Sequence, residues 1–328
     1  MTSRPAPVPV VAIGASSGGI EALWGLLAAL PPTLDAAVLV VLHTPAHGES
    51  NLDRVLAQRS ALPVRFVEDG ETLAPGTVVL PRPDRHLMLD GTTLRSANGP
   101  KECRVRPAIN VLFRSVAESV GRRAIGVVLS GSLDDGTAGL WAIQRQGGLA
   151  FVQDPGDALF DSMPLSALEH VAADGVASAP QLAPLVARAV SQFRAAAAVD
   201  APAAEGAGEL GIESRLAVGA SVGIDAVYTL GRPSRYACPE CHGVLSQIEE
   251  GRILRFRCHT GHGYSLQTLA AALDRDVDDS LLNARRALEE KIMLIERASP
   301  QRPAGLDSAP LARARERLDA LRTLLRAS

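Results

Sequence analysis

Apolar runs of strand length alternate with amphipathic segments over the first 195 residues of the chain. Val10–Ile13, Ala37–Leu42 and Ala124–Leu129 are continuous aliphatic runs, which are typical of strands buried on both faces. Ile20–Leu30 and Ile109–Val120 instead repeat apolar residues three or four positions apart, as one face of a helix does. The alternation predicts an α/β fold: a doubly wound, mostly parallel sheet with helices on both faces.

A change of composition marks the end of this predicted domain, residues 1–195. Ala, Pro, Gly and acidic residues dominate the stretch that follows, which is the composition of a linker. We therefore expect a linker and an irregular segment over residues 196–235. Within that segment, the apolar residues of Ser214–Val218 and Ala226–Leu230 suggest two short strands.

The last part of the chain divides into a small module rich in Cys and His at 236–265 and a helical region at 266–328. Leu266–Ile295 carries apolar residues three, four or seven positions apart, which predicts one long helix with a single apolar seam. A Pro-containing break follows at 299–310, and a second helix is expected from Leu311 to about Leu325. A helical hairpin that buries the two seams against each other is the simplest arrangement.

The overall charge and the cysteine content narrow the range of partners and compartments. A formal net charge of −3 argues against general attraction to nucleic acid or to anionic membranes. The N-terminal residues 1–8 have no apolar signal core, and the longest apolar runs are too short to cross a bilayer. We therefore expect a cytoplasmic protein without membrane insertion. Three of the four cysteines cluster late in the chain, which favours a metal site over a disulfide framework.

The turn after the first strand, Gly14-Ala15-Ser16-Ser17-Gly18-Gly19, is the first candidate for chemistry. It precedes a predicted helix, whose unpaired N–H groups face whatever binds there. The pattern fits a nucleophile elbow that exposes Ser16, the phosphate turn of a short-chain dehydrogenase, or a plain glycine turn with capping serines. The dehydrogenase alternative fails, because Ile20 replaces its third glycine and His43 replaces its acidic residue.

Three polar residues, Ser16, His43 and Asp135, each follow a predicted buried strand. The carboxyl ends of parallel strands lie at one edge of a sheet, so these side chains are expected to converge. Such a set suits nucleophilic acyl transfer: His43 accepts the proton of Ser16, and Asp135 orients the imidazole and stabilises its charged form. Backbone N–H groups near Ser17 and in the Ser132–Leu133 loop are expected to stabilise the oxyanion.

Two neighbouring residues are the alternatives for these roles. Ser17 is the alternative nucleophile, although we expect its side chain to cap the following helix. Asp134 is the alternative acid, although we expect it to be a solvated loop residue.

Several short motifs accompany these residues: Ile13-Gly14-Ala15-Ser16-Ser17-Gly18-Gly19, Val41-Leu42-His43, Pro75-Gly76, Pro83-Asp84-Arg85-His86, Arg106-Pro107-Ala108-Ile109-Asn110-Val111-Leu112-Phe113, Gly126-Val127-Val128-Leu129-Ser130-Gly131, Asp134-Asp135-Gly136 and Met163-Pro164. In this order they resemble the catalytic domain of chemotaxis protein-glutamate methylesterases of the CheB type. The resemblance runs from about Val8 to Phe193, which is more than half of the chain.

The resemblance implies a Ser-His-Asp hydrolase that demethylates methyl-glutamate side chains on chemoreceptors or similar helical signalling proteins. Some relatives also deamidate glutamine there. It places the nucleophile on Ser16, the base on His43 and the acid on Asp135. The chain departs from the family in having Ser132 where methionine is usual and Asn110 where aspartate is common.

A further departure concerns regulation. Fewer than ten residues precede the first predicted strand, so we expect no phosphorylatable receiver domain ahead of the catalytic domain. Phosphorylation within the chain is then not expected to control the enzyme.

Two closely spaced pairs of potential metal ligands occur in the later module, separated by a predicted β-hairpin around Glu249-Glu250-Gly251. Two such chelating turns suit a tetrahedral Zn²⁺ ion bound by thiolates and an imidazole. We assign as ligands Cys238, Cys241, Cys258 and His262. His259 and His242 are alternatives for the fourth position. Four protein ligands leave no position for water, so the zinc is expected to be structural; the module resembles the zinc ribbons appended to some methylesterases of this family.

The ribbon-like module and the helical region also suggest partners other than the substrate. Three arginines of the module suggest nucleic acid, but Glu249, Glu250 and the lack of interleaved aromatic residues argue against it. The helical hairpin is expected to pack on itself or to mediate dimerisation. A sharper hypothesis is that the module and the hairpin dock a regulatory partner in place of the receiver domain.

Two hypotheses for the function follow. The main one is a hydrolase of protein methyl-glutamate esters, and the alternative is a non-catalytic scaffold that recognises receptor-like helices. The complete set of Ser16, His43 and Asp135 favours the enzyme.

Overall fold

The structure is a computed structural model that describes residues 8–45, 48, 50–196, 207–220, 222–298 and 309–327. The chain divides into two compact units, Met1–Leu269 and Ala270–Ser328. Within the described residues, the first unit contains all the strands and the second is helical. Residues 197–206 of the predicted linker and residues 299–308 of the predicted break lie outside the described residues, and the four predicted domain boundaries stay predictions.

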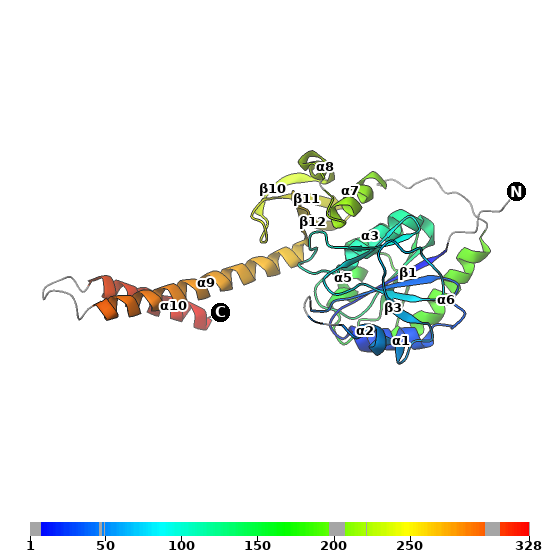
Figure 1. Cartoon of the computed structure of the whole chain (residues 1–328), viewed down its shortest axis with the longest axis horizontal. Coiled ribbons are helices and arrows are strands. Elements are labelled where there is room, and N and C mark those ends of the chain that lie inside the picture. The colour runs from blue at the N-terminus through cyan, green and yellow to red at the C-terminus, as the bar shows by residue number, and fades with distance from the viewer. Residues whose placement is uncertain are drawn as a thin grey trace. The chain divides into compact units, whose positions relative to one another are not determined.

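A seven-stranded sheet forms the centre of the first unit (Figure 1). Its strands are β1 (Val10–Ala15), β2 (Ala37–Leu42), β3 (Val64–Phe66), β4 (Val78–Leu80), β7 (Ala124–Val128), β8 (Leu149–Gln153) and β9 (Gly175–Ala177). The strand order is β3-β4-β2-β1-β7-β8-β9, and every neighbouring pair is parallel. All residues of the central β1 are buried, as its aliphatic sequence requires. The predicted sheet is therefore confirmed.

Helices cover both faces of this sheet (Figure 1). Alternate residues of β1 belong to two different hydrophobic cores, because successive strand side chains point to opposite faces. One core contains apolar residues of α1 (Gly19–Ala29), α2 (Leu52–Ala57) and α6 (Ala179–Ala195). The other contains those of α3 (Ile109–Val120), α4 (Thr137–Arg145) and α5 (Ser162–His170). The doubly wound architecture follows from this division.

An antiparallel hairpin packs on α3. It consists of β5 (His86–Asp90) and β6 (Thr93–Ala97), with the predicted turn at Asp90-Gly91. Gly91 has a φ of 59°, a left-handed conformation that glycine adopts without steric cost. A short 3₁₀ helix, Gly121–Arg123, then leads into β7.

Two helices follow where short strands were expected. The structure has α7 (Ala207–Ala217) and α8 (Ile224–Leu230), so the strands predicted at Ser214–Val218 and Ala226–Leu230 are wrong. In α7 the buried residues are Leu210, Glu213, Leu216 and Ala217, which is helical spacing. Because Glu213 is charged, the helical spacing of the buried residues cannot be recognised from the apolar residues of the sequence alone.

A second sheet completes the first unit. It is antiparallel and consists of β10 (Arg232–Ala237), β11 (Val244–Glu250), β12 (Ile253–Cys258) and β13 (Gly263–Ser265) in that order. The predicted hairpin at Glu249-Glu250-Gly251 joins β11 to β12, and Gly251 has a φ of 59°. This sheet, with its Cys and His residues, is called the ribbon module below.

The second unit consists of two helices. α9 (Leu266–Ala298) begins at the end of the ribbon module and continues into this unit, and α10 is Ala309–Ala327. Ion pairs from Arg315 to Glu296 (2.6 Å) and from Arg322 to Glu289 (3.3 Å) show that α10 runs antiparallel to the second half of α9. The predicted pair of helices is therefore present. None of the described helices combines the length and hydrophobicity that a bilayer crossing requires.

Candidate active site and metal centre

Ser16 stands in the turn between β1 and α1. Its N–H donates to the Ser130 carbonyl (2.9 Å), and its own carbonyl accepts from the Gly19 N–H (2.9 Å), so the backbone is fixed on both sides. Gly18 is required in this turn: its φ is 69°, and a Cβ there would collide with Leu159. The turn therefore presents the serine at the carboxyl edge of the parallel sheet.

Ser17 does not cap the helix as expected. Gly18 is the N-cap of α1 and no side chain caps it. The Ser17 hydroxyl instead accepts a hydrogen bond from the Ser132 hydroxyl (3.3 Å). Within the described part of the chain, the backbone N–H groups of Ser17 and Ser132 have no hydrogen-bond acceptor. Ser17 directly follows Ser16, and Ser132 directly follows Gly131, which packs against the Ser16 side chain, so both residues lie close to the candidate nucleophile.

His43 follows β2 and bridges the other two predicted residues. Its Nδ1 lies 3.0 Å from Ser16 Oγ, and its Nε2 lies 2.9 Å from Asp135 Oδ2. The His43 N–H donates to the Ala15 carbonyl (3.2 Å), where the paired strands β1 and β2 end together. With Asp135 accepting from Nε2–H, Nδ1 is free to accept the serine proton. The imidazole is 15% exposed, so its open edge reaches solvent.

Asp135 is the buried member of the set, with 3% of its side chain exposed. Besides His43, its carboxylate accepts the backbone N–H groups of Ile109 (2.7 Å) and Asn110 (3.0 Å) at the start of α3. A helix N-terminus favours an anion at this position. The structure thus brings Ser16, His43 and Asp135 into one hydrogen-bonded chain.

Asp134, the alternative acid, has a different partner. Its Oδ1 accepts the Ser265 hydroxyl (2.7 Å), and no hydrogen bond joins it to His43 among the described residues. Burial raises the pKa of Asp134 to about 6, although the bond from Ser265 works in the opposite direction. The geometry therefore favours Asp135 as the acid.

Asn110 has a supporting role that the sequence did not indicate. It is buried, and its Oδ1 accepts the N–H groups of Gly136 (3.1 Å) and Gly139 (2.7 Å). These bonds join the start of α3 to the turn directly after Asp135. In the sequence, the only sign of this role was the departure from the family pattern at Asn110. That departure did not show that Gly136 and Gly139 would be its hydrogen-bond partners.

Three exposed apolar side chains form what is called the apolar rim below: Leu159 (71% exposed) and Phe160 (44%) in the loop beside the Ser16 turn, and Leu165 (50%) shortly after them in α5. The Phe160 carbonyl accepts the Gly131 N–H (2.9 Å), which places this loop against the Ser16 turn. Among described residues up to 196, the only other large apolar residue as exposed as these is Val176. Leu159 and Phe160 fall in an irregular loop, where no periodicity marks their exposure in the sequence, whereas Leu165 lies in α5.

The predicted metal ligands also converge. One ligand atom from each of Cys238, Cys241, Cys258 and His262 lies within 4.8 Å of the others. Cys241 Sγ and Cys258 Sγ are 3.6 Å apart, and Cys258 Sγ is 3.5 Å from His262 Nδ1. The alternatives His242 and His259 are outside this group, the only such cluster found among the described residues. Three thiols and an imidazole are the donor set of a structural zinc site.

Buried charges join the ribbon module to the parallel-sheet domain. Glu102 contacts Arg114 of α3 and Arg257 of β12 (2.7 Å to the latter), while Glu213 of α7 contacts Arg257 and Arg255 (3.2 Å to the latter). All five side chains are 3–4% exposed. Burial alone would raise the pKa of Glu102, but Arg114 and Arg257 hold it well below its ordinary value.

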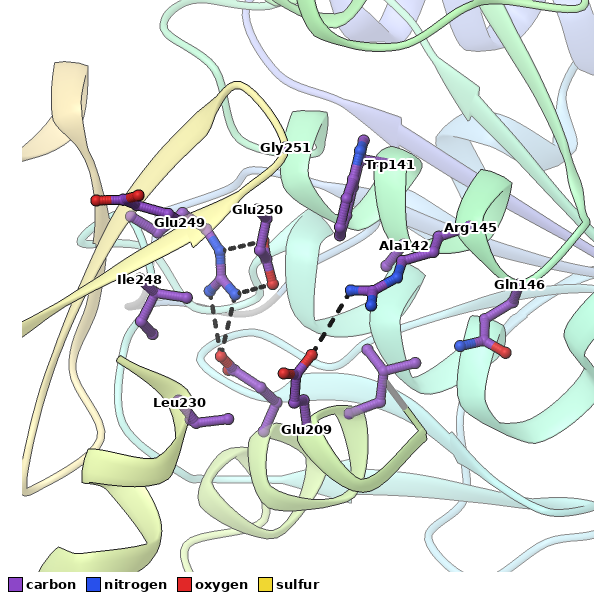
Figure 2. A pocket seen from close by; sticks show the side chains of 13 residues that line it. Trp141, Ala142, Arg145, Gln146, Glu209, Leu230, Ile248, Glu249, Glu250 and Gly251 are labelled. Atoms are coloured by element: carbon purple, nitrogen blue, oxygen red, sulfur yellow. Dashed lines mark hydrogen bonds and ion pairs between the residues drawn. The ribbon is translucent and has the colours of Figure 1, made fainter. Parts of the chain in front are cut away.

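A cavity of about 360 Å³ lies beside this network, between α4, α7 and the β11–β12 hairpin. Figure 2 shows Arg145 paired with Glu209 across it, and Glu250 bound within the network. The Arg145 guanidinium also lies 5.1 Å from the Trp141 ring. None of the Ser16, His43 and Asp135 side chains lines the cavity, so it belongs to the module interface and not to the catalytic edge.

Comparison with known proteins places these features in a family. The family model "CheB methylesterase" matches residues 11–186, more than half of the chain. "Protein-glutamate methylesterase/protein-glutamine glutaminase 5" of Anaeromyxobacter dehalogenans is 39% identical over 180 residues, covering 53% of this chain and 49% of the relative. A second enzyme of that designation, from Methanosarcina acetivorans, is 35% identical over 195 residues, covering 57% of this chain and 55% of the relative. The chain thus spans about half the length of the curated relatives it matches.

A solved structure agrees with these matches. The crystal structure of the Thermotoga maritima CheB methylesterase catalytic domain superposes with a TM-score of 0.54 and 30% identity. It covers 56% of this chain and 98% of the Thermotoga domain. The ribbon module and the last two helices lie outside the matched residues 11–186. Over those residues, the chain belongs to the CheB methylesterase family.

Proposed function

We propose that this chain is a protein-glutamate methylesterase, in which Ser16 is the nucleophile, His43 the base and Asp135 the acid. The observation that carries the proposal is the chain of hydrogen bonds from Ser16 Oγ to His43 Nδ1 (3.0 Å) and from His43 Nε2 to Asp135 (2.9 Å). Membership of a methylesterase family supports it and favours an enzyme over the non-catalytic scaffold. The His43 imidazole is 15% exposed, so it is accessible from solvent.

The proposed reaction is a two-step acyl transfer. Ser16 Oγ attacks the ester carbonyl carbon as its proton passes to His43 Nδ1, while Asp135 stabilises the imidazolium through Nε2. The N–H groups of Ser17 and Ser132 stabilise the oxyanion. Collapse breaks the bond to the methoxy group, which takes the proton from His43 and leaves as methanol. Water then attacks the acyl-enzyme by the same route and releases a glutamate carboxylate and Ser16.

The same groups suffice for deamidation of glutamine. In that case the leaving group is the amide nitrogen, which takes the proton from His43 and departs as ammonia. The second step with water is unchanged. The relatives' designation as both methylesterase and glutaminase supports this second activity.

The apolar rim supports a protein substrate. A single ester side chain is too small to cover Leu159, Phe160 and Leu165, whereas a helix that brings an ester to Ser16 places neighbouring side chains over them. We propose that a chemoreceptor or a similar helical signalling protein carries the methylated glutamate.

Zinc is the metal that we propose for the ribbon module. Thiolates from Cys238, Cys241 and Cys258 with the imidazole of His262 are the donors that fit it. When bound, the ion supplies cross-linking of two chain turns and no catalytic chemistry, because the protein fills all four positions. The bound ion would hold the turn between Cys238 and Cys241 and the turn between Cys258 and His262 in a fixed relation.

Labelling with a fluorophosphonate tests the nucleophile directly. This reagent forms a covalent bond with an activated serine, so peptide mass spectrometry should find the adduct on Ser16 and none in the Ser16→Ala protein. A Ser17→Ala protein should be labelled as the wild type is. An adduct on Ser17, or no adduct at all on the folded wild-type protein, would contradict the proposal.

A further inference from the structure

A serine of the ribbon module reaches the loop that carries the catalytic acid. Ser265, the last residue of β13, donates from its hydroxyl to Asp134 Oδ1 (2.7 Å). Asp134 directly precedes Asp135. Ser265 lies well beyond residue 186, where the family match ends, so this contact comes from a part of the chain that the family domain does not contain.

Ser265 is itself held firmly. It pairs with Arg255 of β12, and it begins α9 with a reciprocal cap, in which its N–H donates to Thr268 Oγ1 (2.8 Å) and the Thr268 N–H donates to Ser265 Oγ (3.0 Å). Only 9% of Ser265 is exposed. One hydroxyl therefore accepts from the helix and donates to Asp134, with little freedom to rotate away.

The start of β13 is anchored to the parallel-sheet domain as well. The Cys103 N–H donates to the Gly263 carbonyl (2.8 Å), and the Gly263 N–H donates to the Lys101 carbonyl (3.2 Å). Gly263 directly follows His262, the fourth candidate metal ligand. Hydrogen bonds thus join the start of β13 to Lys101 and Cys103 and its last residue, Ser265, to Asp134.

The loop that receives this contact has two left-handed residues. Leu133 has a φ of 64° and Gly136 a φ of 101°, one on each side of the Asp134-Asp135 pair. A non-glycine residue in this conformation persists only where surrounding contacts hold it. The start of α3 holds the Asp135 carboxylate, and Ser265 holds the Asp134 carboxylate.

We propose that Ser265 is a positioning residue of the active site: by holding Asp134, it keeps Asp135 aligned with His43. The inference rests on the function proposed above. Through Ser265, the ribbon module would then help to maintain the geometry of the catalytic residues. A misplacement of a catalytic group by about 1 Å can lower a rate by about 10².

The test compares three single variants in the full chain. Ser265→Ala should lower both the rate of fluorophosphonate labelling at Ser16 and the kcat for a small ester by about tenfold, with KM nearly unchanged. Ser265→Thr keeps the hydroxyl and should stay within about twofold of the wild type. Thr268→Val removes the other half of the helix cap but leaves the bond to Asp134, so it should also stay within about twofold. Equal metal content and circular dichroism of all variants would exclude unfolding as the cause.

A double-mutant cycle shows whether the effect passes through Asp134. The Ser265→Ala/Asp134→Ala protein should be no slower than the slower single variant, because both changes remove the same bond. Wild-type rates for Ser265→Ala, or an equal loss in Thr268→Val, would overturn the inference while leaving the proposed function intact. Failure of the wild-type protein to label at Ser16 would overturn both.

Discussion

The catalytic edge and the module interface lie in the same unit, but different kinds of contact hold them. At the catalytic edge, backbone N–H groups fix Ser16, His43 and Asp135 where strands end and α3 begins. At the module interface, buried side-chain charges such as Glu102 and Arg257 are added to a few backbone hydrogen bonds, such as the one from the Cys103 N–H to the Gly263 carbonyl. The first site depends mainly on the course of the main chain, and the second depends in addition on the identity of a few long side chains.

Because the contacts differ, mutations in the two regions are expected to have different effects. A side chain held by backbone donors at a strand end can be replaced without leaving a buried charge unpaired, so such changes affect chemistry more than folding. A buried ion network fails when one member is removed, because the remaining charges are left without partners. Mutations should therefore separate the two regions by what they damage.

The largest effect is expected at the metal centre. Cys258→Ser should abolish stoichiometric zinc binding and expose the amides of residues 238–262 to hydrogen exchange. In zinc-finger peptides such binding supplies about 10 kcal/mol or more, which is also folding free energy. Cys103→Ser is the matched control, since Cys103 is a buried cysteine outside the cluster and its variant should keep one zinc per chain. Full zinc retention in Cys258→Ser would contradict the ligand assignment.

The next largest effect is expected from the two adjacent aspartates. Asp135→Asn should lower kcat for ester hydrolysis by about 10⁴, because an amide no longer holds the required tautomer of His43. Asp134→Asn keeps an oxygen acceptor for Ser265 and should lower kcat by less than about tenfold. Steady-state kinetics on a small ester compares them, and the reverse order would show that Asp134 is the acid.

Loss of one interface arginine should act on stability. Arg257→Met leaves Glu102 and Glu213 short of a partner and should lower the free energy of unfolding by about 3–5 kcal/mol. Arg82→Met removes the exposed pair with Glu68 in the same unit and should cost less than about 1 kcal/mol. Urea unfolding measures the loss of unfolding free energy in both variants. Equal losses would mean that the buried charges of the interface stabilise the protein no more than an exposed ion pair does.

The smallest effect concerns substrate recognition. Leu159→Ser should raise KM for a methylated helical protein about tenfold, equivalent to ~1.4 kcal/mol, while a small ester is hydrolysed as before. Val176→Ser changes an exposed apolar residue on the edge strand β9, three strands from β1 in the sheet order, and should leave both activities unchanged. If the two variants behave alike, the apolar rim does not contact the substrate.

The contrast between the regions also explains what the sequence could predict. Continuous aliphatic runs mark β1, β2 and β7, and the residue that follows a parallel strand is bound to lie at the carboxyl edge. Ser16, His43 and Asp135 could therefore be chosen before any distance was known. The two ligand pairs, Cys238 with Cys241 and Cys258 with His262, could be recognised as well, because metal ligands commonly occur in closely spaced turns.

Other features depend on contacts between distant segments and left no local pattern. Glu213 interrupts the apolar stripe of α7, and the predicted strand began directly after it, at Ser214, so the helical spacing back to Leu210 was missed. Ser265 lies 131 positions from Asp134, and an isolated serine at the start of a helix ordinarily signals only a cap. Leu159 stands in an irregular loop, where exposure cannot be inferred from spacing.

Methanol release from a methylated chemoreceptor cytoplasmic fragment tests the central claim most directly, with the wild-type protein compared against Ser16→Ala. We expect release by the wild type and loss of release in Ser16→Ala, because the acyl-enzyme forms on the Ser16 hydroxyl that is hydrogen-bonded to His43. Release that persists in Ser16→Ala would contradict the assignment of the nucleophile. Absence of release from a wild-type protein that is folded and zinc-loaded would contradict the proposed activity on chemoreceptors.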